Sequence, residues 1–402
     1  MGKHRTVQPF LLVPATVMSA LGRRLLDTSS GGLDRRGICQ AITLLTWANT
    51  GFRRAGAERR HVNSCIYLAS AYGRLAERDG GLDPINAAIA VAQTGIAALQ
   101  GNAEDPRLAE LYGILGYALT RRCERSGLLE DAAEAIACYE QGLACLPKPA
   151  GSMRESVLRA GLGTALVRLS EREAGEAGLR RAVSELEQAL TISAQGPDPQ
   201  TRASISNTLA TALTRLGERT GKVEYLLRGQ ACLESALAVR QQQHVPLAWS
   251  ATVTDLGNLL VRLGEATGEP AHLERAVRLF GDALDVATLE RSPRDYAEAQ
   301  NNLGYTLTRL SQLTGERRFL TDALSAFAEA EKGAPRADAE LDWAVIQIGY
   351  AEAWLQFGKR AEAQEALAAA DRALAVIGPA MAPVAWANAR SVRARAEALL
   401  EA

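Results

Sequence analysis

The sequence predicts an all-α protein built from about eight repeated pairs of helices. Three observations predict this class: a step of 47 residues that recurs along most of the 402-residue chain, a large-small-large residue pattern at each step, and a composition rich in Ala and Leu. Ala and Leu favour helices because they lose little conformational freedom there. No strand-like alternation of apolar and polar residues competes with this pattern.

The first helix of each repeat is marked by positions 0, +1 and +4, counted from a leading residue. These offsets fall on one side of a helix. A small residue at +1, such as Gly257 after Leu256, lets a neighbouring helix come close. The leading residues are Leu21, Leu68, Leu115, Leu162, Leu209, Leu256, Leu303 and Tyr350.

The second helix of the first seven repeats shows a small, mostly large, small pattern at offsets +20, +24 and +27, and the last repeat has Ala363, Leu367 and Ala370 at a shorter spacing. After Leu256, for example, these residues are Ala276, Phe280 and Ala283. They again share one helical face. Gly residues such as Gly268 mark the turn between the two helices, where a left-handed backbone conformation ends a helix.

This order of residues resembles the tetratricopeptide repeat, whose usual unit is about 34 residues. The longer unit is similar to extended arrays in bacterial proteins. The resemblance implies a right-handed superhelical α-solenoid of antiparallel helix pairs, with the first helices lining a concave groove. It also implies a non-catalytic scaffold or adaptor that binds a peptide or protein segment in that groove.

The chain is expected to have three segments. Residues 1–14 would form an N-terminal arm, and residues 15–378 would form the solenoid of eight helix pairs. Residues 379–402, which follow the last repeat, would form a helix that caps the open end of the stack.

The charge balance disfavours nucleic acid and membranes as partners. Lys and Arg total 45 and Asp and Glu total 46, which leaves a net charge of -1. No run of 18 apolar residues predicts a membrane span. The six cysteines form no CxxC pair, and Pro14 interrupts a signal-like apolar stretch, so we expect a cytoplasmic protein with reduced thiols.

The motifs of common catalytic and cofactor sites are absent. The chain has four histidines and no HExxH pattern, and it lacks the glycine-rich sequences that bind nucleotide phosphates. No GxSxG motif positions a nucleophilic serine. We therefore expect no metal, no cofactor and no enzymatic activity.

Six successive repeats carry Arg at offset +6. A ladder of free arginines would bind carboxylates or phosphates, which would make the partner acidic. However, offset +9 is Glu in five of these repeats and Gln in the sixth, and an Arg–Glu pair three residues apart stabilises a helix by about 0.2–0.5 kcal/mol. Both interpretations stay open. The arginines are Arg74, Arg121, Arg168, Arg215, Arg262 and Arg309.

Other polar residues are also expected to face the groove. On a helical wheel, offsets -5, -2, +2, +5, +6 and +9 lie opposite the packed face. Amide and phenol groups at these offsets can hydrogen-bond a peptide backbone. The candidates at -2 and +2 are Tyr117, Asn207, Asn258, Asn301 and Tyr305, and Asp255 and Asn302 follow at -1.

Two other functions remain as alternatives. The array could self-assemble into a structural scaffold, a homo-oligomer joined through its ends or its outer face. It could also bind RNA, with the arginines following the phosphates, although the near-zero net charge and the interleaved glutamates disfavour this.

Overall fold

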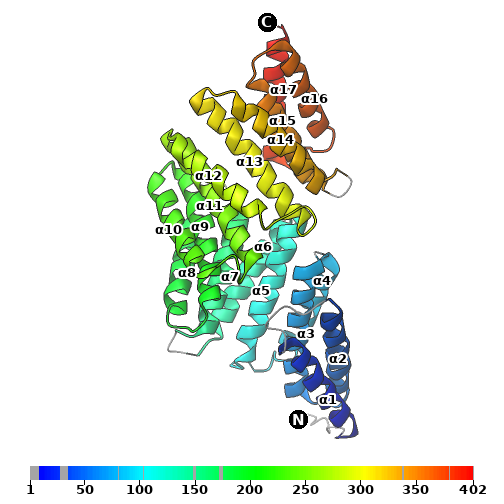
Figure 1. Cartoon of the computed structure of the whole chain (residues 1–402). Coiled ribbons are helices and arrows are strands. Elements are labelled where there is room, and N and C mark those ends of the chain that lie inside the picture. The colour runs from blue at the N-terminus through cyan, green and yellow to red at the C-terminus, as the bar shows by residue number, and fades with distance from the viewer. Residues whose placement is uncertain are drawn as a thin grey trace. The chain divides into compact units, whose positions relative to one another are not determined.

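The computed structural model describes residues 9–27, 35–79, 81–102, 104–147, 151–171, 175–336, 339–379 and 381–401. These residues fold into seventeen α-helices, and no strand occurs among them (Figure 1). The helices follow one another as eight pairs, and a single helix follows the last pair. The predicted all-α class with paired helices is confirmed.

The chain divides into two compact units, and the first is Met1–Asp198. Helix α1 begins at Pro9, within the segment expected to be an arm. The four pairs of unit 1 are α1 (Pro9–Asp27) with α2 (Arg35–Arg54), α3 (Glu58–Asp79) with α4 (Leu82–Ala97), α5 (Arg107–Ser126) with α6 (Leu129–Ala144), and α7 (Met153–Ser170) with α8 (Ala177–Ser193).

The second unit is Pro199–Ala402. Three of its first helices begin with a proline, at residues 199, 246 and 293, where the missing N–H would have no partner in the helix anyway. Its helices are α9 (Pro199–Thr220), α10 (Val223–Val239), α11 (Pro246–Thr267), α12 (Pro270–Leu284), α13 (Pro293–Thr314), α14 (Arg318–Gly333), α15 (Glu340–Leu355), α16 (Arg360–Leu374) and α17 (Pro383–Glu401).

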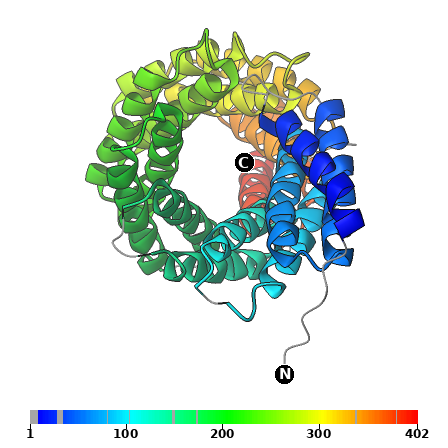
Figure 2. The same cartoon turned by 90° about the horizontal axis from the view of Figure 1, so that it is seen from below.

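Within unit 2, the first helices of successive pairs form one layer and the second helices form another (Figures 1 and 2). Helix α9 contacts α11, α11 contacts α13 and α13 contacts α15. Among the described residues, successive second helices such as α10 and α12 make no such contact. The first helices are therefore more closely spaced, which places them on the inner side of the local curvature, as the resemblance implies.

The two helices of a pair interlock through a large side chain and a small one. A Cβ atom added to Gly257 of α11 would lie 2.7 Å from the ring of Phe280 on α12. Gly163 stands in the same relation to Leu186. These residues occupy offsets +1 and +24 of one repeat, so the small residue allows the close approach that the sequence pattern predicts.

Buried titratable side chains in unit 1 belong to the core. His61 and Cys65 are both buried on α3, with the His61 Nε2 and Cys65 Sγ atoms 4.0 Å apart. Burial lowers the pKa of His61 and raises the pKa of Cys65. Both side chains are therefore neutral at neutral pH, and neither is activated for chemistry.

The interlocking of Gly257 with Phe280 can be tested by exchanging their sizes. Gly257→Ala alone should destabilise unit 2 by about 1–3 kcal/mol because the new methyl group meets the Phe280 ring. The double variant Gly257→Ala with Phe280→Leu recreates Ala210 and Leu233 of the neighbouring repeat, so it should recover part of that loss. Urea unfolding of both single variants and the double variant measures the coupling. Simple additivity would contradict this packing.

The buried His61 predicts how stability depends on pH. Its pKa in the folded protein lies below the usual value of 6.5, so the unfolded state binds more protons as the pH falls below 6.5. The wild type should therefore lose stability between about pH 7 and about pH 5. The variant His61→Leu should lose less over the same interval, as measured by thermal unfolding at each pH. Equal losses would show that His61 does not titrate in this way.

Candidate functional site

The arginines at offset +6 in unit 2 form a continuous ladder with glutamates at +9. Glu218 of α9 lies between Arg215 of the same helix and Arg262 of α11, at 3.4 Å and 2.8 Å respectively. Glu265 repeats this arrangement, at 2.8 Å from Arg262 and 3.0 Å from Arg309. Each glutamate thus joins two successive first helices. We call this set of ion pairs the Arg–Glu ladder.

Unit 1 contains the same arrangement. Glu124 lies 2.6 Å from Arg121 on its own helix and 3.1 Å from Arg168 on the next first helix. Arg74 differs, because its Nη1 donates a hydrogen bond to the main-chain oxygen of Leu26 at 2.8 Å. Five of the six predicted arginines are therefore paired with a glutamate of the repeat array.

Carboxylates of the protein itself neutralise the paired arginines. Burial acts to lower the pKa of Arg262, but the neighbouring carboxylates outweigh it and the net shift is upward. Both partners are partly exposed, so each pair contributes only about 0–1 kcal/mol. Of the two interpretations that the sequence left open, the geometry favours the self-neutralised stripe over a ladder of free arginines.

The two tyrosines at offset +2 belong to the Arg–Glu ladder as well. The Tyr305 hydroxyl donates to Glu265 at 2.6 Å and accepts from the Nε of Arg309 at 3.0 Å. Tyr117 likewise donates to Glu77 and accepts from Arg121. These hydroxyls are engaged within the protein, so they are less suited to binding a ligand than the sequence suggests.

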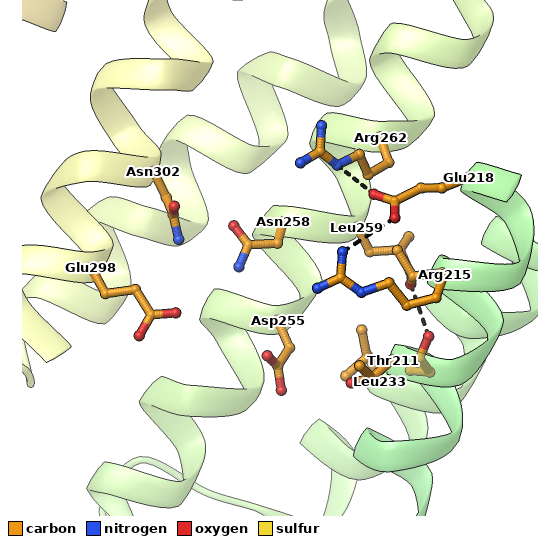
Figure 3. Close-up of a pocket in the computed structure, with 12 residues that line it drawn as sticks. Thr211, Arg215, Glu218, Leu233, Asp255, Asn258, Leu259, Arg262, Glu298 and Asn302 are labelled. Atoms are coloured by element: carbon orange, nitrogen blue, oxygen red, sulfur yellow. Dashed lines mark hydrogen bonds and ion pairs between the residues drawn. The ribbon is translucent and has the colours of Figure 1, made fainter. Parts of the chain in front are cut away.

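A cavity of about 270 Å³ opens on the inner layer of unit 2, where α9, α11 and α13 lie side by side (Figure 3). Its walls are largely polar, and of the predicted site residues only Arg215, Asn258 and Arg262 line it. The full lining consists of Ala210, Thr211, Thr214, Arg215, Glu218, Leu233, Asp255, Asn258, Leu259, Arg262, Glu298 and Asn302.

The two sides of this cavity differ in their electrostatics. Arg215, Arg262 and Glu218 form one side, where their charges are paired (Figure 3). Asn302 and Glu298 of α13 reach in from the other side. Asn258 of α11 lies between these two residues and the paired charges. The side with Asn302 and Glu298 therefore offers hydrogen-bonding groups and a carboxylate that the ladder does not neutralise.

A network behind the cavity holds Asp255 in place. The Asn207 Nδ2 donates to Asp255 at 3.1 Å and to Thr252 at 3.0 Å. Arg240, which is only 8% exposed, donates to Thr252 and Ser204, both at 2.7 Å. Burial lowers the pKa of Arg240, and the nearby Asp255 carboxylate opposes that shift. Asp255 therefore serves as the counter-charge of a buried arginine.

The remaining amide candidates do not line the cavity. Asn207 contacts α11 from the flank of α9, and Asn301 is absent from the cavity wall while its neighbour Asn302 is present. Glu298 was not among the predicted residues. It occupies offset -5, which the helical wheel already assigns to the groove, so reading that offset along the chain would have found it.

Among the described residues, no group of three or more His, Cys, Asp or Glu side chains is placed to hold a metal ion. None of the helices in the described part of the chain combines the length and apolar character needed to cross a bilayer.

Neither a protein-family model nor a curated protein matches this sequence. Solved structures do resemble the fold. A Rap protein in complex with competence and sporulation factor has a TM-score of 0.54 and 12% identity, covering 97% of this chain and 99% of that one. The human IFIT1 dimer with PPP-AAAA has a TM-score of 0.50 and 12% identity, covering 96% of this chain and 78% of that one.

At such low identity this likeness concerns the fold alone. Both neighbours are repeat proteins of the tetratricopeptide type. The described helices of this chain follow the same paired order, with a large-on-small contact inside the pairs. The chain is therefore a helical repeat protein with the tetratricopeptide-type fold.

Proposed function

We propose that this chain is a non-catalytic adaptor that binds an extended peptide or protein segment in the cavity of unit 2. One observation carries the proposal: three successive first helices place amide, hydroxyl and carboxylate groups around a single cavity on their inner side. The fold supports it, because helical repeat arrays offer extended inner surfaces to their partners.

The spacing of the two asparagines suits a peptide backbone. Asn258 and Asn302 lie on neighbouring first helices, and packed helices are about 8–10 Å apart. An extended chain advances about 3.3 Å per residue, so the two amides would meet backbone groups about three residues apart. Each amide offers both a donor and an acceptor, which matches the N–H and C=O groups of a peptide.

The Arg–Glu ladder bears on the chemistry of the partner. An acidic partner was expected if the arginines were free, but Arg215 and Arg262 already share Glu218. The same pairing weakens the RNA alternative, since phosphates would compete with bound carboxylates. Self-assembly through other surfaces stays a prediction. A cytoplasmic location with reduced thiols also stays a prediction.

Selection of phage-displayed random peptides on the wild-type protein tests the groove. The double variant Asn258→Ala with Asn302→Ala removes two sets of hydrogen bonds, each worth about 0.5–1.5 kcal/mol, so the selected peptides should bind it about tenfold more weakly. Asn388→Ala on the exposed surface of α17 is the matched control. Fluorescence anisotropy gives the affinities. Equal binding to the double variant and the wild type would disprove the proposed site.

Neutralising Glu218 tests whether its ion pairs keep Arg215 and Arg262 from binding acidic ligands. In Glu218→Gln, Arg215 and Arg262 lose their shared carboxylate, so an oligoglutamate peptide should bind the variant several-fold more tightly than the wild type at low salt. The gain should vanish at high salt because the new charges are exposed.

Glu274→Gln on α12, an exposed carboxylate outside the cavity, supplies the same change in net charge. It should leave oligoglutamate binding unchanged. Equally tight binding of oligoglutamate by the wild type would mean that the arginines are available to acidic ligands after all.

A further inference from the structure

Five charged side chains line the cavity of unit 2, and four of them already have an electrostatic partner. Arg215, Arg262 and Glu218 form part of the Arg–Glu ladder. Asp255 is the counter-charge of the buried Arg240 behind the wall. Glu298 is the fifth: within the described part of the chain its side chain makes no hydrogen bond and no ion pair, and Arg294 alone favours its ionised form.

The surroundings of Glu298 hold more negative than positive charge. On its own helix stand Asp295, which accepts a hydrogen bond from a serine hydroxyl, and Arg294, which lies 3.7 Å from Asp342 of α15. Asp255 of the neighbouring helix α11 also lines the cavity (Figure 3). The only arginine close to Glu298 on its own helix is thus shared with another carboxylate.

This environment disfavours the ionised form of Glu298. Its side chain reaches solvent, but the surrounding walls desolvate it, and desolvation is the main cause that raises its pKa. The carboxylates of Asp295 and Asp342 add to this effect, while Arg294 opposes it. A positive ligand group placed beside Glu298 would favour its ionised form and so offset the cost of desolvation and repulsion, whereas a negative one would increase the repulsion.

The amides beside Glu298 suit the same ligand group. An ammonium or guanidinium carries only hydrogen-bond donors, and it needs several acceptors once it leaves water. Glu298 offers two carboxylate oxygens, and Asn302 of the same helix and Asn258 of the neighbouring α11 each offer a carbonyl oxygen (Figure 3). Charge-assisted hydrogen bonds of this kind are stronger than neutral ones and favour a fixed register of the bound chain.

We infer that the segment bound in unit 2 carries a lysine or arginine side chain whose charged group pairs with Glu298, with Asn258 and Asn302 accepting its remaining hydrogen bonds. This inference rests on the proposed function and adds the chemical class of the ligand. It predicts a cationic partner where the arginines taken alone had predicted an acidic one.

The test uses random peptides displayed on phage and selected on the full-length wild-type protein. Sequences that bind should be enriched in Lys or Arg at one position relative to the starting library. The tightest selected peptide is then synthesised in two forms, with its Lys or Arg retained or replaced by norleucine. Both forms are titrated against the wild type and against Glu298→Gln by fluorescence anisotropy.

On the wild type, the norleucine form should bind about tenfold more weakly than the cationic form. On Glu298→Gln the two forms should differ little, because the partner of the cation is gone. Glu274→Gln, which alters an exposed carboxylate on α12, should behave like the wild type. Circular dichroism confirms that each variant keeps its helices.

The failures of the two proposals are distinguishable. This inference would be overturned if the selected peptides lack a cation. It would also be overturned if removing the cation weakens binding equally in the wild type and Glu298→Gln. Neither result would contradict the proposed peptide-binding cavity. Peptides that bind equally well without Asn258 and Asn302 would overturn the proposed function, and the inference would fall with it. Failure to select any peptide on the wild type would do the same.

Discussion

The structure depends on one packing contact: a large side chain of a second helix resting on a small residue of the first helix in the same pair. Leu186 on Gly163 and Phe280 on Gly257 are two instances, one in each unit. The missing Cβ of the glycine lets the two helix backbones approach each other. The large side chain that fills the space fixes how one helix is rotated against the other. Since the contact recurs at the same offsets, every other offset on the first helices also recurs in a constant orientation.

A constant orientation turns a sequence repeat into a periodic surface. Arg at +6 and Glu at +9 are close on one helix, and stacking also brings each Glu to the Arg of the following helix, as Glu218 does with Arg262. The inner layer is therefore largely neutral by construction. Under the proposed function, recognition would depend on positions where the period breaks. In the last rung, Gln312 replaces the glutamate and accepts from Arg309 at 2.8 Å. In the cavity, Glu298 stands outside the ladder altogether.

The helix pairs and their order were predictable because they follow from periodicity within one helix. The pairing of Arg262 with Glu218 was not, since it joins residues 44 positions apart and depends on how two helices stack. Asn207 shows the limit of a single-helix wheel. At offset -2 it lies on the flank that meets α11, so its amide binds Asp255 and Thr252 rather than a ligand. The cavity likewise depends on side-chain sizes on three helices, which no single wheel contains.

A chain with a net charge near zero can still be selective when most of its charges are paired and a few are not. The net charge of -1 averages over pairs such as Arg215 with Glu218, which contribute little field at a distance. Neutral pairs weaken adventitious attraction to polyanions, because every phosphate would have to displace a carboxylate that is already in place. In the proposed site, Glu298 would attract a cationic group and repel an acidic segment, which would meet Glu298 and Asp255 together. In the proposed site, selectivity would follow from Glu298, a charge that lies outside the Arg–Glu ladder.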